Sequence, residues 1–373
     1  MPEKGVYQER LQQVVHSLKK TELDALLLNR LGNIAYLTGA VNSCSWVFLT
    51  RKGDQVALVL ASDAPVYREE SAIQDVRSFR IHDPFALFKS VMEELGITRS
   101  KIGLELSRPG LPQHVLSMLR YALPPTVQMV NGETILEEIR AIKAKEEIEA
   151  IEDAVRITEL GMEVAIRNIK PGIKESEVVL EAEYAMRKAG GRVPVLSYVG
   201  SGKRSCIAHH TPSGKIIQKG DVVTLDIHGG YLGYCADLAR TVVCGEISRE
   251  VEEAYAFLVR AQEETLKICR QGVSMIEVKK TFYRNLAEAA GYHFLLGPVI
   301  HGVGIMNSEM PHFTFPYQDK GYPEVLQANM VVAVSNIGLY SDQGWGVRVE
   351  DMVLVTENKP ISLTHFSKEL ISI

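Results

Sequence analysis

The sequence predicts an α+β protein, with a small α/β domain at the amino terminus and a larger domain built from a duplicated unit. Three observations predict this class. Helix and strand patterns alternate in the first part of the chain, two similar helix pairs follow in the second part, and a long β-hairpin lies between those pairs. Because 373 residues exceed one typical core, we expect two domains, at 1–130 and 131–373.

Helices and strands alternate along the amino-terminal domain. Apolar residues recur at three-and-four spacing in Tyr7 to Lys20, which predicts an amphipathic helix. Short apolar and β-branched runs bounded by turn residues predict strands, and further amphipathic runs predict helices. The expected strands are Ala25 to Leu28, Ser45 to Leu49, Gln55 to Leu60 and Lys101 to Leu106, and the further helices are Pro84 to Leu95 and Gln113 to Tyr121.

The second domain opens on a long charged helix, Ile139 to Asn168, and then repeats itself weakly. Lys170-Pro171-Gly172-Ile173 and Arg270-Gln271-Gly272-Val273 are offset by 100 residues (272 − 172), and each follows a helix pattern and precedes another. The glycine predicts a helix C-cap, and Ser176 and Ser274 are candidate starts of the next helices. We expect a duplicated unit of two helices and strands, whose halves face each other across one sheet. The strands expected after the helix pairs are Val193 to Val199, Met330 to Val334 and Val347 to Val355.

The hairpin between the repeats carries two acids in apolar arms. Gly230-Tyr231-Leu232-Gly233 supplies turn residues between the arms Val222 to Ile227 and Leu238 to Val243. A loop over these four residues pairs positions whose numbers sum to 463, so Asp226 faces Asp237 (226 + 237 = 463). Directly paired side chains lie roughly 5 Å apart, where like charges destabilise a sheet.

Something positive has to balance these two acids. A divalent cation bound by carboxylate oxygens is our first interpretation, and Arg240 or a shared proton are the alternatives. Solvation of both acids on an exposed hairpin is the remaining alternative, and the apolar arms count against it. The same pairing sets His228 opposite Cys235, on the side of the sheet that carries the acids.

The composition excludes several classes of function. A net charge of −5 and a pI near 6.1 offer no basic surface for nucleic acid or for an anionic membrane. No apolar run approaches the roughly 20 residues of a membrane span, and the first residues lack the pattern of a signal peptide. Five cysteines without a C-x-x-C pair fit free thiols in a reducing compartment. We expect a cytoplasmic protein with no nucleic acid or membrane partner.

Further polar candidates for a common site lie outside the hairpin. Arg348 and Glu350 alternate with apolar residues, so they share one face of a predicted strand, where an acid needs a partner. His301 lies in a glycine-rich stretch that lets backbone or ligand approach closely. His209 and Asn336 complete the set. Spacing alone does not unite these residues with the hairpin.

Taken together, these residues and their surroundings resemble the creatinase, prolidase and methionine aminopeptidase family. The order of the polar residues matches that of the family. Four short motifs match as well: Ser201-Gly202-x-x-Ser205, Asp237-x-x-Arg240-Thr241, His301-Gly302-x-Gly304 and Gly346-x-Arg348-x-Glu350-Asp351. Two further motifs resemble the amino-terminal domain and linker of prolidases and aminopeptidases P, namely Asn33-Ile34-x-Tyr36-Leu37-Thr38-Gly39 and Arg140-x-Ile142-Lys143-x-x-Glu146-Glu147. The resemblance covers nearly the whole chain. It implies the pseudo-two-fold pita-bread fold for the second domain.

By this resemblance the site is a two-metal centre. The implied metal ligands are Asp226, Asp237, His301 and Glu350, the last of which bridges both ions. The implied catalytic residues are His209, which hydrogen-bonds the reacting amide, with Glu350 and Arg348. Ions that share a water lower its pKa and polarise the scissile carbonyl. Oxygen-rich ligation with one imidazole suits Mn, Co or Fe at least as well as Zn.

Three positions depart from the family pattern. Asn336 replaces a carboxylate ligand; its amide oxygen can still bind a metal but brings no charge, so we expect the cation beside His301 to be held less tightly. Ser308 stands where the family has a second histidine that donates to the reaction intermediate. His228 stands where the family has a small residue, and it either adds a ligand beside Asp226 or fills the cavity. We expect one or two ions, with ligands retained on the Asp226 side and an altered site on the His301 side.

Three functions are compatible with the resemblance and its departures. The first is a metal-dependent hydrolase of a peptide C–N bond, similar to Xaa-Pro dipeptidases, with an altered metal site and a small peptide as substrate. The second is a creatinase-like hydrolase of a small C–N compound, able to act without metal, in which His209 and Glu350 do acid–base work. The third is a non-catalytic module that binds peptides or proteins, which Asn336 and Ser308 favour. The resemblance also implies a homodimer.

Overall fold

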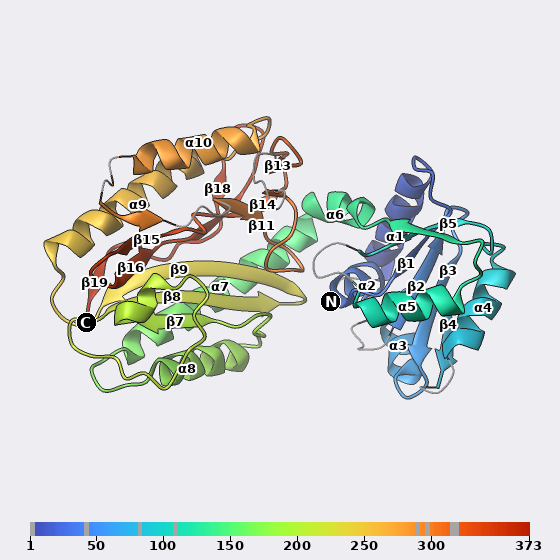
Figure 1. The fold of residues 1–373 in the computed structure, drawn as a ribbon, viewed down its shortest axis with the longest axis horizontal. Coiled ribbons are helices and arrows are strands. Elements are labelled where there is room, and N and C mark those ends of the chain that lie inside the picture. Colours follow the sequence, from blue (N-terminus) through green and yellow to red (C-terminus); the bar gives the residue numbers. More distant parts are fainter. Residues whose placement is uncertain are drawn as a thin grey trace. The chain divides into compact units, whose positions relative to one another are not determined.

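The computed structural model describes residues 4–40, 45–80, 84–106, 111–287, 289, 291–294, 299–313 and 321–373. The chain divides into two compact units, Met1–Ile139 and Arg140–Ile373 (Figure 1). The assignment of two domains to 1–130 and 131–373 stays a prediction.

A six-stranded sheet organises the first unit, with the strand order β4-β3-β2-β1-β5-β6. β1 (Ala25–Leu28) runs antiparallel to β2 (Ser45–Thr50) and parallel to β5 (Lys101–Leu104), and all four of its residues are buried. The remaining strands and the helices are β3 (Gln55–Leu60), β4 (Asp75–Phe79), β6 (Gln128–Asn131), α1 (Lys4–Leu18), α2 (Leu31–Thr38), α3 (Ala64–Glu70), α4 (Pro84–Glu94) and α5 (Gln113–Ala122). The predicted α/β alternation is confirmed, while α2, α3, β4 and β6 are elements that the sequence patterns missed.

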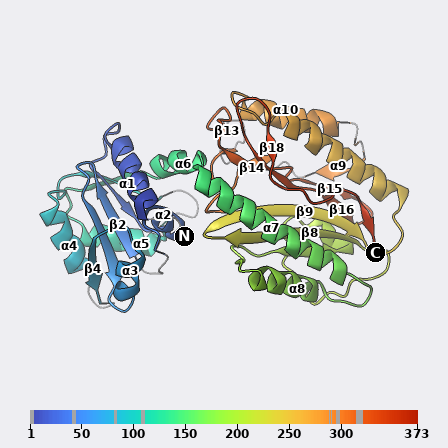
Figure 2. The same ribbon diagram turned by 180° about the vertical axis from the view of Figure 1, so that it is seen from behind.

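The second unit contains two helix pairs with strands between them, as Figures 1 and 2 show. The helices are α7 (Lys145–Asn168), α8 (Glu175–Lys188), α9 (Arg249–Ile268) and α10 (Met275–Leu286), preceded by α6 (Thr134–Ala141). The hairpin strands are β8 (Val222–Tyr231) and β9 (Tyr234–Val243). The shorter elements are β7 (Tyr198–Ser201), the 3-10 helix η1 (Gly202–Cys206), β10 (His293–Phe294), β11 (Ile300–Gly302), β12 (His312–Phe313), β13 (Gly321–Tyr322), β14 (Val331–Val334), β15 (Gly338–Ser341), β16 (Trp345–Arg348), β17 (Asp351–Leu354), β18 (Ile361–Ser362) and β19 (Ile371–Ser372).

Each helix pair covers its own strands. Met186 of α8 and Ile227 of β8 belong to one buried apolar cluster, and Phe282 of α10 belongs to another with residues of β15 and β16. The strands form separate sheets, with the orders β19-β9-β8-β7, β11-β14-β17-β18, β10-β15-β16 and β12-β13. The expectation of one sheet is therefore wrong. Two sheets are joined where the main chains of Ala239 and Glu350 exchange N–H···O bonds of 3.0 and 3.3 Å.

Matched main-chain contacts confirm the internal repeat. The N–H of Gly172 donates to Ile217 O at 2.9 Å, and the N–H of Gly272 donates to Leu326 O at 2.9 Å. Both glycines have positive φ, 96° and 83°, which lets the chain turn sharply after a helix. They do not cap the helices as predicted, because α7 and α9 already end at the C-caps Ile169 and Cys269.

The helix starts in the two copies differ. Ser274 is the N-cap of α10, and its hydroxyl accepts from the N–H of Glu277 at 3.1 Å, as predicted. The prediction for Ser176 is wrong, because α8 begins at Glu175 with Lys174 as N-cap. There the carboxylate of Glu177 accepts from the N–H of Lys174 at 2.9 Å and satisfies the helix start in place of a hydroxyl.

Two predicted elements are broken or shortened. The helix expected over 139–168 is interrupted between α6 and α7, where the N–H of Lys143 donates to Asn329 O at 2.9 Å instead of continuing the helix. The buried Lys143 ammonium also lies 3.1 Å from Glu309. The strand expected over 347–355 divides into β16 and β17 around Glu350, whose main chain pairs with Ala239. The strand expected over 193–199 is shorter and shifted, at β7.

The hairpin register differs from the prediction. Tyr231 pairs with Tyr234, so the loop holds only Leu232 and Gly233, with φ of 45° and 98°. Two successive positive φ angles are the pattern of a type I′ turn, whose twist matches that of the strands. The strands therefore extend further, and paired positions sum to 465 (231 + 234) rather than 463.

Within the described ranges, none of the helices has the length and apolar character needed to cross a bilayer. The described cysteines, Cys206, Cys235, Cys244 and Cys269, are free thiols, whereas Cys44 lies outside the described residues.

Candidate metal centre

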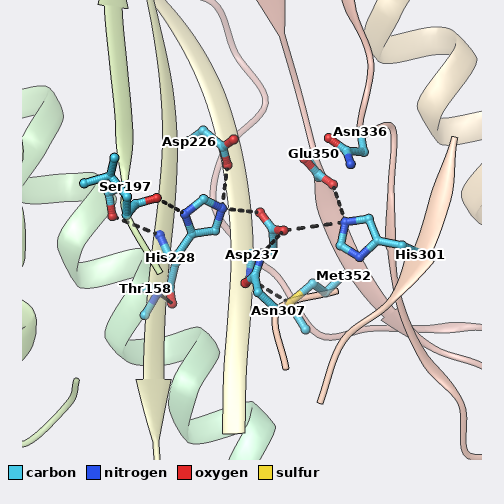
Figure 3. Close-up of polar contacts among 12 residues, drawn as sticks. Thr158, Ser197, Asp226, His228, Asp237, His301, Asn307, Asn336, Glu350 and Met352 are labelled. Carbon is cyan, nitrogen blue, oxygen red and sulfur yellow. Dashed lines mark hydrogen bonds and ion pairs between the residues drawn. The ribbon is translucent and has the colours of Figure 1, made fainter. Parts of the chain in front are cut away.

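The hairpin places three polar side chains on one buried face. The predicted pairs are wrong: Asp226 pairs with Ala239, and His228 pairs with Asp237 instead of Cys235. Because the register differs from the prediction by two residues, each side chain keeps its predicted face of the sheet, and both acids and the imidazole point to the same side. Each of the three residues is at most 3% exposed. Figure 3 shows the His228 ring turned toward both carboxylates.

The two ring nitrogens of His228 have different surroundings. Nδ1 lies 2.8 Å from the carbonyl oxygen of Leu196, which only accepts hydrogen bonds, so Nδ1 carries a proton. Nε2 lies 3.2 Å from Asp226 Oδ1 and 3.3 Å from Asp237 Oδ1. The backbone N–H of His228 donates to the Ser197 hydroxyl at 3.2 Å. The ring is thus fixed with Nε2 facing the acids.

His301 on β11 approaches the same acids from the second repeat. Its Nε2 lies 3.6 Å from Asp237 Oδ2 and 3.4 Å from Glu350 Oε1, and its Nδ1 lies 3.1 Å from Gly302 O. Glu350 reaches the hairpin because its main chain pairs with Ala239 of β9. Asp237 therefore lies between the two imidazoles, as Figure 3 shows.

Arg348 at the end of β16 holds the outer side of the cluster. Its Nη1 donates to Asp226 Oδ2 at 2.5 Å, and its Nη2 donates to Glu350 Oε2 at 3.1 Å. Nη2 also donates to Asn336 Oδ1 at 2.6 Å. The amide oxygen that stands where the family has a carboxylate ligand is therefore already bound by the guanidinium of Arg348. A guanidinium with its fork of donors fits this arrangement of several oxygens.

The donor set fits a divalent cation. Among the described residues, four carboxylate oxygens are buried without a hydrogen-bond partner, and three of them belong to the cluster: Asp226 Oδ1, Asp237 Oδ1 and Glu350 Oε1. Buried oxygens left unpaired cost free energy unless a cation or proton meets them. The three acids, with His228 and His301, form two groups that are compact enough for metal ligation, Asp226-His228-Asp237 and Asp237-His301-Glu350. Carboxylate oxygen and imidazole nitrogen are common ligands of first-row divalent metals.

The electrostatics of the cluster call for positive charge. Burial alone would lower the pKa of His301, but the neighbouring Glu350 raises that pKa to about 9. Burial and the charge of Asp237 raise the pKa of Glu350 to about 7. Burial also opposes a charged His228, yet Asp226 and Asp237 raise the pKa of His228 well above its usual value. The raised pKa values mean that His228, His301 and Glu350 hold protons, and a metal cation would compete with these protons for the same atoms.

Asp226 and His209 show the influence of Arg348. Burial would raise the pKa of Asp226, but the Arg348 guanidinium and then His228 hold it well below its usual range. Partial desolvation of the ring and the Arg348 charge lower the pKa of His209. His209 is exposed, and its ring lies 5.5 Å from that of Tyr198, between ring centroids. It is the predicted site residue for which the structure gives no direct hydrogen bond to the cluster among the described residues.

Sequence reasoning missed several groups that contact the acids. Asn307 Nδ2 donates to Asp237 Oδ2 at 2.9 Å, and the N–H of Asp237 points to the Met352 sulfur at 3.1 Å. Ser308, the residue that the sequence analysis singled out in this segment, is exposed. Its neighbour Asn307 is the residue that reaches the acids. Asn307 was detectable as a polar residue six positions after His301. The carbonyl of Leu196 had no signal in the sequence.

The duplicated helix pairs around a buried cluster of acids and imidazoles are the arrangement expected of the pita-bread fold. The chain belongs to the metallopeptidase family M24, which it matches over residues 149–357, and residues 10–142 match the creatinase/prolidase N-terminal domain. These matches confirm the family resemblance and the fold class.

Similar proteins span nearly the whole chain. A Xaa-Pro dipeptidase of Pyrococcus horikoshii is 28% identical over 368 residues, which cover 98% of this chain and 99% of that protein. An uncharacterized peptidase of Bacillus subtilis is 31% identical over 355 residues, 94% of this chain and 96% of that protein. The crystal structure of a recombinant prolidase from Thermococcus sibiricus gives a TM-score of 0.90 at 26% identity, covering 98% of this chain and 99% of that one.

Proposed function

We propose that the protein is a metal-dependent hydrolase of small peptides that cleaves the Xaa-Pro bond of dipeptides. The observation that carries the proposal is the buried cluster of Asp226, Asp237, His301 and Glu350 with unpaired inner oxygens. The names of similar proteins, Xaa-Pro dipeptidase and prolidase, support the same reaction class.

The residues of the cluster have distinct roles in this proposal. Divalent Mn, Co, Fe or Zn held by the acids and imidazoles would polarise the scissile carbonyl and acidify a water. Arg348 keeps the outer oxygens of Asp226 and Glu350 occupied, so that their inner oxygens stay turned to the cations. His209, with its lowered pKa, is neutral near pH 7 and hydrogen-bonds the substrate amide.

The test measures metal and turnover in the same preparation. Protein purified anaerobically is analysed for metal and then assayed with matched Xaa-Pro and Xaa-Ala dipeptides in the presence of Mn or Co. Bound metal and turnover confined to the Xaa-Pro series are expected. Asp237→Asn loses both, whereas Asp75→Asn, at a partly exposed pair with Arg77, keeps both. Absence of metal and turnover contradicts the proposal and leaves a non-catalytic binding module.

A creatinase-like reaction without metal is the second candidate. It is favoured by the raised pKa of Glu350, about 7, which suits acid–base work, and by the imidazole of His228 that already faces both aspartates. Turnover of a small amidino or amide compound that persists in strong chelator would select this candidate. Turnover that chelator abolishes would exclude it.

Two further expectations accompany the proposal, one from the family resemblance and one from the composition. The chain forms a homodimer, which light scattering coupled to size-exclusion chromatography measures directly. It works in the cytoplasm, in keeping with the free thiols of the described cysteines. A monomeric mass at micromolar concentration would contradict the first expectation.

A further inference from the structure

Two imidazoles of the cluster are arranged alike. His228 and His301 each direct Nδ1 at a main-chain carbonyl, Leu196 O at 2.8 Å and Gly302 O at 3.1 Å. Each directs Nε2 between two carboxylate oxygens, and one of these always belongs to Asp237 (Figure 3). Metal-bound histidines commonly donate their other ring N–H to a carbonyl in this way.

Asp237 serves both imidazoles with different oxygens. Its Oδ1 faces His228 and its Oδ2 faces His301, where Asn307 Nδ2 also donates to it. The other two acids each serve one side, Asp226 through Oδ1 and Glu350 through Oε1. Their second oxygens are bound to Arg348. Asp237 is therefore the acid placed to connect two groups of three ligands.

The distances suit shared cations better than hydrogen bonds. Nε2 of His228 lies 3.2 and 3.3 Å from its two acids, and charge-assisted N–H···O bonds are shorter, about 2.7–2.9 Å. Two ligand atoms that bind one ion at about 2.1 Å lie roughly 3.0–3.4 Å apart. The facing oxygens of Asp226 and Asp237 have no hydrogen-bond partner among the described residues, and both residues are at most 3% exposed.

We propose that His228 is a metal ligand. One ion is held by Asp226, His228 and Asp237, and the other by Asp237, His301 and Glu350. The inference rests on the proposed function only in requiring a metal. It adds a second imidazole, that of His228, to the ligands that the family resemblance implies.

Asn336 fits this arrangement as a residue outside the ligand set. Its amide oxygen accepts from Arg348 at 2.6 Å, so it anchors the guanidinium that orients Asp226 and Glu350. The ligand lost at Asn336 is replaced on the opposite side, by His228. Because each ion then has one imidazole, the centre favours Zn, Co or Fe over Mn, which prefers oxygen ligands.

Metal stoichiometry tests the assignment. Wild type, His228→Ala, Asn336→Ala and His209→Ala are stripped, reloaded with Co or Zn and titrated by calorimetry, with folding checked by circular dichroism. Two ions are expected in wild type, Asn336→Ala and His209→Ala, and one in His228→Ala. One ion in wild type that becomes two in His228→Ala would show that the imidazole occupies a cation position, and this overturns the proposal. An unchanged count in His228→Ala overturns it too.

Nuclear magnetic resonance of the Co-loaded wild type gives a test that does not depend on a variant folding. Each ligating imidazole contributes a strongly shifted, exchangeable Nδ1–H resonance, and the carbonyls of Leu196 and Gly302 slow its exchange. Two such resonances are expected, and a single one overturns the proposal. Neither readout uses peptide turnover. Two bound ions without dipeptide hydrolysis would refute the proposed function alone, and one ion with hydrolysis would refute this inference alone.

Discussion

At the scale of single residues, Arg348 connects the parts of the candidate centre. One guanidinium donates to Asp226, Glu350 and Asn336, and to the carbonyl of Ala208 at 3.1 Å. Its side chain is 5% exposed, so these acids share one buried positive charge. Removal of such a partner leaves buried carboxylates uncompensated, which costs far more than loss of a surface pair.

Arg348→Met is expected to lower the free energy of unfolding by about 3–5 kcal/mol. Urea denaturation in the presence of chelator measures this loss, because a bound cation would mask the freed carboxylates. The matched control is Arg167→Met, where an exposed arginine pairs with Glu163 at 2.7 Å. That change should cost no more than about 1 kcal/mol. Equal losses in both variants would contradict the role assigned to Arg348.

Glu175, which lies outside the candidate centre, makes a contribution to stability that depends on pH. The buried carboxylate accepts from the hydroxyls of Ser213 at 2.7 Å and Ser201 at 2.9 Å, and from Arg204 Nε at 2.9 Å. Burial would raise the pKa of Glu175, but these hydrogen bonds outweigh it and lower the pKa. The contribution to stability is therefore complete above the unfolded pKa of about 4.3 and is lost as pH falls through the lower folded pKa.

Glu175→Gln should accordingly be less stable than wild type at pH 7 by about 1–3 kcal/mol. The difference should shrink on acidification to about pH 3, because the wild-type carboxyl then becomes protonated as well. Urea unfolding at several pH values measures it, with Glu163→Gln as the exposed control, whose effect should stay within about 0.5 kcal/mol. A difference that grows on acidification would contradict the lowered pKa.

At the scale of elements, the hairpin turn shows a local conflict between sequence and conformation. Leu232 has φ of 45°, although leucine has a side chain that disfavours the left-handed region. Its side chain is 46% exposed, so packing does not compensate fully. Asparagine followed by glycine is the preferred pair in a type I′ turn, and Gly233 is already in place.

Leu232→Asn is expected to stabilise the protein by about 1 kcal/mol, because asparagine tolerates positive φ at lower cost. Chemical denaturation of the two proteins measures the gain. Leu180→Asn is the control, since Leu180 is 64% exposed but lies within α8. There the change should cost about 0.5 kcal/mol through helix propensity. A loss at both positions would mean that Leu232 is held by contacts rather than strained.

The same turn explains where the sequence-based predictions succeed and fail. Asp226, Asp237, His301 and Glu350 were selected by motif, and they lie together because strand alternation and the repeat are encoded locally. The predicted hairpin register was wrong because Leu232 has no intrinsic preference for the turn that it occupies. The contacts of Asn307, Met352 and the Leu196 carbonyl depend on how distant segments pack, which local pattern does not determine.

At the scale of the whole molecule, the candidate ligands belong to one of the two compact units. All of them fall within Arg140–Ile373, and they come from β8, β9, β11 and the junction of β16 and β17. The six-stranded sheet of the first unit contributes none. A cation that binds the folded state stabilises the unit that holds its ligands.

Removal of metal should therefore loosen the second unit selectively. Hydrogen exchange followed by mass spectrometry, with and without chelator, should show faster exchange in peptides that cover β8, β9, β11 and β17. Peptides from β1, β2 and β5 should exchange equally in both conditions. Uniform change throughout the chain, or none at all, would contradict the location of the centre.

The junction between Ala239 and Glu350 has a consequence for how the duplicated halves depend on each other. The first half supplies Asp226, His228 and Asp237, and the second half supplies His301 and Glu350. A fragment that ended before α9 would carry one complete triad of ligands, whereas the other triad exists only when both halves have docked. Under the proposed assignment, the first half alone would hold the ligands of one ion, whereas the second ion would bind only after the two halves have docked.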